Sequence, residues 1–296
     1  MKKGKKRRLS EAAEAYLLLL PFGIFFILFV LYPIGRSIAD SFTDYNLSGR
    51  NFIGLKNYTR LFADRAFTAS VKNTLIYAAA SIFPLMALGL AAALLVNRQS
   101  KAMFAARAAL MTPYVTSLVA VSMVFLCLYD PTTGAFNKIL VTLGLPRQQF
   151  LYSRTTALWC IVAMNIWKNF GYVMILYLAG LTGVPESLTE AAELDGAGTW
   201  AKLVHIQLPH LAPVSYLLFT TQLVECFKTF EPVRLMTQGG PVNATTTITY
   251  QIYLRAFSEF KMGYASAMSV VLLAIVLVIT LLNLKLGHQL DGEAGK

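Results

Sequence analysis

One stretch near the middle of the chain, "MNIWKNFGY", combines two amides with aromatic residues at a helical spacing. Asn165 and Asn169 are four residues apart and therefore share one face of a helix. Trp167, Phe170 and Tyr172 lie beside them. Amides can hydrogen-bond a polar solute, and aromatic rings can stack on sugar rings, although most aromatics in membranes simply pack. This face is therefore a candidate wall of a solute path.

A second stretch, "TQLVECFKTF", carries a comparable polar stripe. Gln222, Cys226 and Thr229 recur along it, and Glu225 is adjacent to them. Tyr114, from an earlier apolar run, could reach the same solute path. For each residue taken singly, a hydrogen bond between two membrane helices is the simpler alternative.

Charged residues interrupt the same two stretches. Lys168 lies in the first, and Glu225, Lys228 and Glu231 lie in the second. Ionisable residues inside a membrane are costly and usually face a bundle interior or a water-filled cavity. Glu225 and Lys228, three residues apart, can simply pair with each other. Together with Lys168 they could instead form the coupling-ion site of a secondary transporter or channel. This is one function to be weighed for the chain.

The elements around these residues are long apolar runs. The chain has 296 residues and only 14% charged residues, whereas soluble domains carry about 25%. Uncharged runs recur at the length of a transmembrane helix, which is about 20 residues. The composition therefore predicts an all-α integral membrane protein embedded in the lipid bilayer. Six spans are expected, at about 16–36, 73–96, 108–129, 157–181, 211–233 and 264–285.

The distribution of charge orients the chain. The net charge is +11, but its densest cluster, "KKGKKRR", directly precedes the first apolar run. Such a cluster is typical of a cytoplasmic end that contacts anionic lipid, and not of nucleic-acid binding. The run from Tyr16 to Ile34 is longer than the core of a signal peptide and is expected to be uncleaved. Twelve basic residues fall on each side of the membrane if the N-terminus is inside. The charges that flank the first helix usually dominate the orientation, so both termini are predicted to be cytoplasmic.

The predicted domains are a basic tail at 1–14, a permease domain at 15–287 and a tail at 288–296.

The segment between the fourth and fifth spans, 184–210, is polar and amphipathic. Ser187 and Glu190 have the spacing of a capping box at the start of a short helix. Gly196 and Gly198 permit a sharp turn. Thr199 could cap a second short helix, which Pro209 would stop. Such a helical pair could fit a groove in another protein, or it could merely lie on the membrane surface.

"EAAELDGAG…IQLP" in this segment resembles the EAA signature of ABC-importer permeases. The matching residues are Glu190, Ala191, Ala192, Asp195, Gly196, Ala197, Ile206, Leu208 and Pro209. Leu203 stands where that family often has a large aromatic residue. Four further segments, "AYLLLLPFGIFFILFVLYPI", "GLKNYTRLF", "GGPVNATTT" and "MGYASAMSVVLL", resemble the carbohydrate branch of the family, so the resemblance covers nearly the whole chain.

The resemblance implies a type I importer permease fold of six transmembrane helices with a cytoplasmic coupling helix. The coupling loop, Ser187 included, would dock on a cytoplasmic ATPase subunit. The partners implied are a second EAA-type permease, two ATPases and an extracellular solute-binding protein. The resemblance also places a sugar path among the middle and later spans, where Tyr114, Asn165, Asn169, Gln222, Glu225, Cys226 and Thr229 are the candidate residues.

The motifs of other classes are missing from the sequence. No G-x-x-x-x-G-K-[ST] occurs, so ATP and Mg²⁺ are expected to be used by a separate ATPase and no cofactor is expected in this chain. No H-E-x-x-H or G-x-S-x-G motif is present, and no catalytic residue is proposed. Cys127, Cys160 and Cys226 form no C-x-x-C pair, and His205 and His210 lack ligand spacing, so no metal site is expected.

Overall fold

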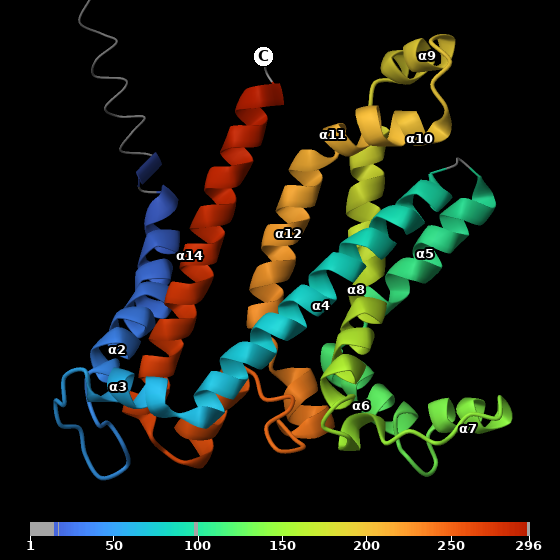
Figure 1. The fold of residues 1–296 in the computed structure, drawn as a ribbon. Helices are drawn as coiled ribbons and strands as arrows, with labels where there is room; N and C mark the ends of the chain where they lie inside the picture. Colours follow the sequence, from blue (N-terminus) through green and yellow to red (C-terminus); the bar gives the residue numbers. More distant parts are fainter. Residues whose placement is uncertain (1–14, 17, 98–99, 295–296) are drawn as a thin grey trace, which may run out of the picture. The chain divides into compact units, whose positions relative to one another are not determined.

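The computed structural model describes residues 15–16, 18–97 and 100–294, almost entirely as helices. The chain divides into two compact units. One contains Met1–Ala63 and Ile252–Val271, and the other contains Asp64–Gln251 and Leu272–Lys296. Figure 1 shows the elements of each unit coloured along the sequence.

Four helices in the described part of the chain are long and apolar enough to cross a membrane. They are Leu18–Ser41, Arg65–Val96, Ala157–Thr182 and Met262–Asn283. These helices fall on the first, second, fourth and sixth predicted spans. The fifth predicted span contains α12 (Ala212–Phe227), which has 16 residues. The arrangement is consistent with six spans, and the number itself stays a prediction.

The third predicted span, 108–129, is not one helix. It is divided into α5 (Lys101–Val115) and α6 (Leu118–Leu128), which are bent by 93° at the break between them. Pro113 lies in the last turn of α5 and cannot donate a backbone hydrogen bond there. Thr116 and Ser117 are extended between the two helices. The apolar run was continuous in sequence, so hydropathy alone could not show this break.

The first unit is built around the long N-terminal helix and a loop that folds back on its end. The π-helical turn η1 (Ile27–Leu31) leads into α2 (Tyr32–Ser41), and α3 (Lys56–Ala63) follows the loop. The Nδ2 of Asn57 donates to the backbone oxygens of Ser41 and Thr43, at 2.8 Å each. Apolar side chains of residues 18–34 are exposed all round the helix, as a lipid-facing helix requires.

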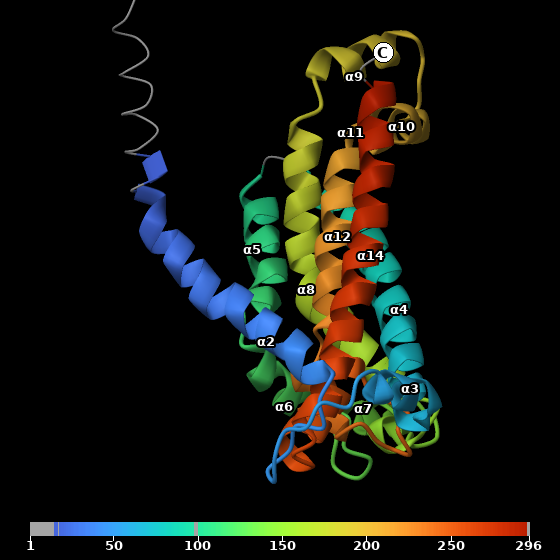
Figure 2. The same cartoon turned by 90° about the vertical axis from the view of Figure 1, so that its left-hand side faces the viewer.

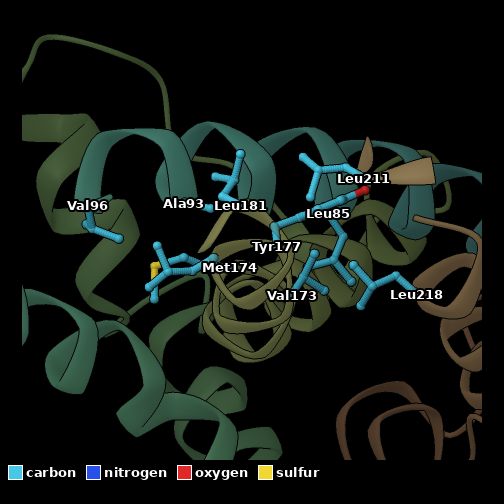
Figure 3. Packing of buried hydrophobic residues seen from close by; sticks show 10 residues of the cluster. Leu85, Ala93, Val96, Val173, Met174, Tyr177, Leu181, Leu211 and Leu218 are labelled. Carbon is cyan, nitrogen blue, oxygen red and sulfur yellow. The ribbon is translucent and has the colours of Figure 1, made fainter. Parts of the chain in front are cut away.

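The second unit is held by packing of α4 (Arg65–Val96) against α8 (Ala157–Thr182). Leu85 and Ala93 of α4 are fully buried, as are Val173 and Met174 of α8, and Figure 3 shows this cluster from close by. α4 begins after Asp64, whose Oδ1 accepts from the N–H groups of the first helical turn. Small residues allow close approach of membrane helices, and α8 uses one at Gly171, where a Cβ would collide with the backbone of α5.

Hydroxyl groups from a later loop hold the end of α12. The side chain of Thr249 donates to the backbone oxygen of Phe227 at 2.9 Å, and that of Thr247 donates to the oxygen of Thr229 at 3.1 Å. These bonds satisfy carbonyls at the C-terminal end of the helix. Thr247 ends the "GGPVNATTT" segment and Thr249 lies two residues after it, so this part of the chain has a structural role that sequence patterns did not indicate.

Short elements complete the fold. In Figures 1 and 2, α9 to α11 lie at one end of α8 and α12, and α6 and α7 lie at the other end. The remaining bounds are α7 (Ala135–Thr142), η2 (Phe150–Tyr152), α9 (Glu186–Leu194), α10 (Thr199–Lys202), η3 (Leu203–Gln207), α11 (Leu208–His210), η4 (Val233–Thr237), α13 (Ile248–Tyr253), η5 (Leu254–Ser258) and α14 (Met262–Ala294).

Gly171→Val tests the close contact between α5 and α8. The added side chain would meet the backbone oxygen of Leu110, so we expect a loss of stability of about 1–3 kcal/mol or more. Thermal unfolding of the purified, detergent-solubilised protein measures it. Gly35→Val is the matched control, because a Cβ at Gly35 meets nothing within 4 Å. Equal melting temperatures for the two variants would contradict the contact.

Candidate functional site

The second unit contains a cavity of about 500 Å³. All seven residues named as a candidate path from the sequence line it. Its walls also include Lys168 and Lys228, which the sequence offered as part of an alternative coupling-ion site, and Glu231, which it marked as a charged interruption. The full lining is Tyr77, Tyr114, Leu118, Asn165, Lys168, Asn169, Tyr172, Thr221, Gln222, Glu225, Cys226, Lys228, Thr229, Glu231 and Pro232. That a solute passes through this cavity stays a prediction.

Two helices supply most of the wall because their polar residues recur at helical spacing. The middle of α8 contributes Asn165, Lys168, Asn169 and Tyr172. The C-terminal half of α12 contributes a second face, which includes Gln222. The sequence patterns located these two faces. They did not locate Tyr77 of α4 or Thr221, which precedes Gln222 on α12.

Amides and phenol rings border the cavity together. The Nδ2 of Asn169 donates to the Oδ1 of Asn165 at 2.9 Å, while the buried Nδ2 of Asn165 has no hydrogen-bond partner. The rings of Tyr114 and Tyr172 are stacked with centroids 4.6 Å apart and an angle of 12° between their planes. The wall therefore combines amide groups with a stacked aromatic pair.

The ammonium of Lys168 lies at the break between α5 and α6. Its Nζ donates to the backbone oxygens of Tyr114 at 2.9 Å, Thr116 at 2.8 Å and Pro113 at 3.3 Å. The last carbonyls of a helix lack intrahelical partners and carry the negative end of its dipole. A lysine has three donors and a positive charge, so Lys168 satisfies the carbonyls that the bend frees.

This geometry gives Lys168 a role that the sequence did not predict. The alternative function required Lys168 as part of a coupling-ion site, yet its donors are occupied by main-chain oxygens of the bend. The Glu225–Lys228 pair, in contrast, forms as the simpler reading expected, with the Lys228 Nζ 2.9 Å from the Glu225 Oε1. Both side chains of that pair are about 64% exposed, so the pair contributes little to stability.

The segment between α8 and α12 forms the expected helical pair with a glycine turn. Gly196 follows α9 with a φ of +80°. Its N–H bonds to the oxygen of Glu193 at 3.0 Å, and the N–H of Ala197 bonds to that of Ala192 at 2.8 Å. This is the Schellman arrangement that ends a helix with a left-handed residue. The Nζ of Lys202 then reaches Glu193 Oε1 at 2.6 Å and ties the two short helices together.

Both expected helix caps are wrong. α9 begins at Glu186, one residue before Ser187, and Pro185 stands at its N-cap without a side-chain hydrogen bond. The fixed φ of Pro185 sets the entry to the helix, and Ser187 lies inside the first turn, where it is no longer at the capping position. Thr199 likewise lies inside α10, whose N-cap is Gly198.

The expected stop at Pro209 is also wrong. Helical structure continues from α10 through the π-helical turn η3 to α11, which ends at His210. In that turn the N–H of Leu208 bonds to the oxygen of Leu203, five residues back. A π-helical turn shifts the hydrogen-bond register by one residue, which accommodates a proline that cannot donate.

Large apolar side chains stand exposed on this helical pair. Leu194 is 90% exposed, Trp200 is 75% exposed, and Leu188 is half exposed. The EAA-signature residues Glu190, Ala191, Ala192, Asp195, Gly196 and Ala197 lie on α9 and its turn, and Ile206, Leu208 and Pro209 lie on η3 and α11. Exposed apolar residues rimmed by charges are typical of a protein interaction surface.

Comparison with known proteins identifies the class. The profile of the family described as "Binding-protein-dependent transport system inner membrane component" matches residues 85–288. The chain belongs to this family. It is a multi-pass inner-membrane transport permease, and its relatives are transporter permeases and not enzymes.

Particular relatives are similar along nearly their whole length. The arabinooligosaccharides transport system permease protein AraP of Bacillus subtilis (strain 168) is 33% identical over 287 residues, covering 96% of this chain and 91% of the relative. The sn-glycerol-3-phosphate transport system permease protein UgpA of Yersinia pestis is 33% identical over 276 residues, covering 91% and 92%. A chain of a bacterial alginate ABC transporter, solved in complex with an alginate pentasaccharide-bound periplasmic protein, superposes with a TM-score of 0.84 at 26% identity and covers 94% of each chain.

Lys168→Met tests whether the hydrogen bonds of Lys168 stabilise the break between α5 and α6. The substitution keeps the length of the side chain but removes the Lys168 donors from the backbone oxygens of Tyr114 and Thr116, while that of Pro113 keeps the N–H of Thr116. Each unsatisfied buried group costs about 1–3 kcal/mol. We expect a clear fall in the melting temperature, with partial recovery in Lys168→Arg, which restores donors and charge. Lys228→Met is the control, because Lys228 is exposed in the wall of the same cavity. A Lys168→Met protein as stable as Lys228→Met would show that the tie does not hold the bend.

Proposed function

We propose that this chain is one permease subunit of an ATP-driven importer, and that it translocates a sugar or oligosaccharide delivered by an extracellular solute-binding protein. Family membership supports the importer class. The cavity, with its amides and stacked tyrosine rings, supports a polar cargo with hydroxyl groups. Among the relatives, one is named for arabinooligosaccharides, and one structural neighbour was solved with an alginate-loaded periplasmic protein.

The observation that carries the proposal is the continuity between the exposed helical pair and the cavity. The pair connects the C-terminal end of α8 to the N-terminal end of α12. The same two helices supply most of the cavity wall. A force applied to α9 would therefore reach α8 directly, and a force applied to α10 would reach α12 through η3 and α11.

The proposed assembly follows from this connection. Two ATPase subunits, which use ATP and Mg²⁺, would bind the coupling loops of this chain and of a second EAA-type permease. Both termini and the helical pair would be cytoplasmic. ATP binding can shift the inward–outward equilibrium only through contacts that differ between the two states. Leu194 and Trp200, exposed on the pair, are the apolar side chains that would make such contacts.

The ion-coupled alternative has less support in the geometry. Lys168 is occupied by backbone oxygens, and Glu225 is paired with Lys228. Uptake into proteoliposomes containing the assembled complex distinguishes the two functions. We expect uptake to require ATP and to persist when ion gradients are collapsed.

Gly196→Val tests the coupling loop. A β-branched residue at a φ of +80° is strained, at a cost of about 1–2 kcal/mol, which corresponds to roughly five- to thirtyfold weaker association with the ATPase. Co-purification of the ATPase from membranes measures the loss. Gly198→Val is the matched control, because Gly198 has an extended φ of −69° and open space around a Cβ. If the ATPase is retained equally by both variants, the loop is not the docking element.

Asn165→Ala and Gln222→Ala test the cavity as the path. Each removes an amide from the wall, and we expect each to lower ATP-driven uptake about five- to tenfold, the effect of losing one or two hydrogen bonds to cargo. Co-purification of the ATPase should stay unchanged. Thr142→Ala, on the exposed face of α7, is the control. Parental uptake rates in both cavity variants would show that cargo takes another route.

A further inference from the structure

We propose that this chain's wall of the cavity favours uncharged saccharides over acidic ones, because each of its cations is already committed within the protein. The inference rests on the proposed function and names the cargo class of the same cavity. It depends on the four charged side chains of the lining, which are Lys168, Lys228, Glu225 and Glu231.

The first cation, Lys168, is saturated. An ammonium has three N–H donors, and the Nζ of Lys168 has three backbone oxygens at 2.8, 2.9 and 3.3 Å. Lys168 as a whole residue is 7% exposed. A carboxylate or phosphate on a cargo could bind this lysine only by displacing these backbone oxygens at the bend of α5 and α6.

The second cation, Lys228, is neutralised locally. Its Nζ lies 2.9 Å from the Oε1 of Glu225, three residues earlier on the same helical turn. The pair presents no net charge to the cavity. An anionic cargo would have to compete for Lys228 with the carboxylate of Glu225, which belongs to the same chain and is already in contact with it.

The remaining charge in the wall is negative. Within the described chain, Glu231 borders the cavity without an ion-pair partner. Like charges repel, and the repulsion is screened less inside a cavity than at an open surface. An acidic cargo would therefore meet one carboxylate without a cationic partner, while the donors of Lys168 are occupied and Lys228 already has Glu225 as its partner.

The uncharged groups of the wall suit hydroxyl-rich cargo. Asn165, Asn169 and Gln222 bring amide groups to the wall, and Glu231 can accept from a hydroxyl group. Stacked phenol rings of Tyr114 and Tyr172 offer an apolar face. This chain thus differs in expected cargo from its structural neighbour, whose description names the acidic polysaccharide alginate, although the two share a fold.

The test measures occupancy of the cavity without the binding protein, which would otherwise select the cargo first. The assembled permease–ATPase complex carries Thr221→Cys as a reporter in the cavity wall, with Cys127, Cys160 and Cys226 replaced by serine. The probes are arabinotriose, maltotriose and xylotriose, and a trisaccharide of uronic acids at the same concentration. The rate of maleimide labelling of the reporter reports protection by each probe.

We expect at least one neutral trisaccharide to slow labelling about two- to fivefold more than the triuronate, the factor for one unfavourable charge in a partly solvated site. Glu225→Gln, which releases Lys228, and Glu231→Gln, which removes the unpaired carboxylate, should each increase protection by the triuronate by a similar factor. Glu259→Gln is the control, since Glu259 lies outside the cavity in an ion pair with Lys261.

The outcomes separate the inference from the proposed function. If the triuronate protects the parental reporter as well as every neutral trisaccharide does, the cargo class is wrong while a saccharide importer stands. If Glu225→Gln and Glu231→Gln leave the triuronate result unchanged, the electrostatic explanation is wrong. If no saccharide of either class protects and ATP-driven uptake is absent, the proposed function fails together with the inference.

Discussion

A single ammonium group at a helix break determines much of the second unit. A bend of 93° between α5 and α6 leaves carbonyl oxygens at the end of α5 outside the helical hydrogen-bond ladder. Lys168 supplies three donors to these oxygens. The bend in turn carries Tyr114 to the edge of the cavity, where its ring stacks on Tyr172. From the sequence, Lys168 was a candidate for a coupling-ion site, whereas in the structure its donors bind backbone oxygens.

The position of α8 explains why this tie matters. α8 packs along α4 through a fully buried apolar cluster and approaches α5 closely at Gly171. Its middle supplies amides and Lys168 to the cavity, and its C-terminal end leads into the α9–α10 pair. One rigid helix thus joins the core, the bend, the cavity and the loop. Such a helix can transmit a displacement because packed interiors yield little to force.

Some details of the loop and of the third span could not be predicted from local patterns. The capping box at Ser187 and the stop at Pro209 followed rules that describe isolated helix ends. In the structure, Pro185 sets the start of α9, and a π-helical turn allows helical structure to continue past Pro209 to His210. Pro113 lies beside the break at Thr116, but the lysine that satisfies the freed carbonyls is about fifty residues away, so no window of local sequence contains both.

The sequence by itself determined the membrane class, the apolar helices, the glycine turn at Gly196 and the two polar helix faces. These follow from local chemistry: length, hydropathy, backbone freedom and helical period act within one element. Only the tertiary structure decided which faces meet around one cavity, which carbonyls Lys168 binds, and that Glu225 neutralises Lys228 while Glu231 has no ion-pair partner among the described residues. Those outcomes depend on distances between elements, and a one-dimensional pattern does not contain such distances.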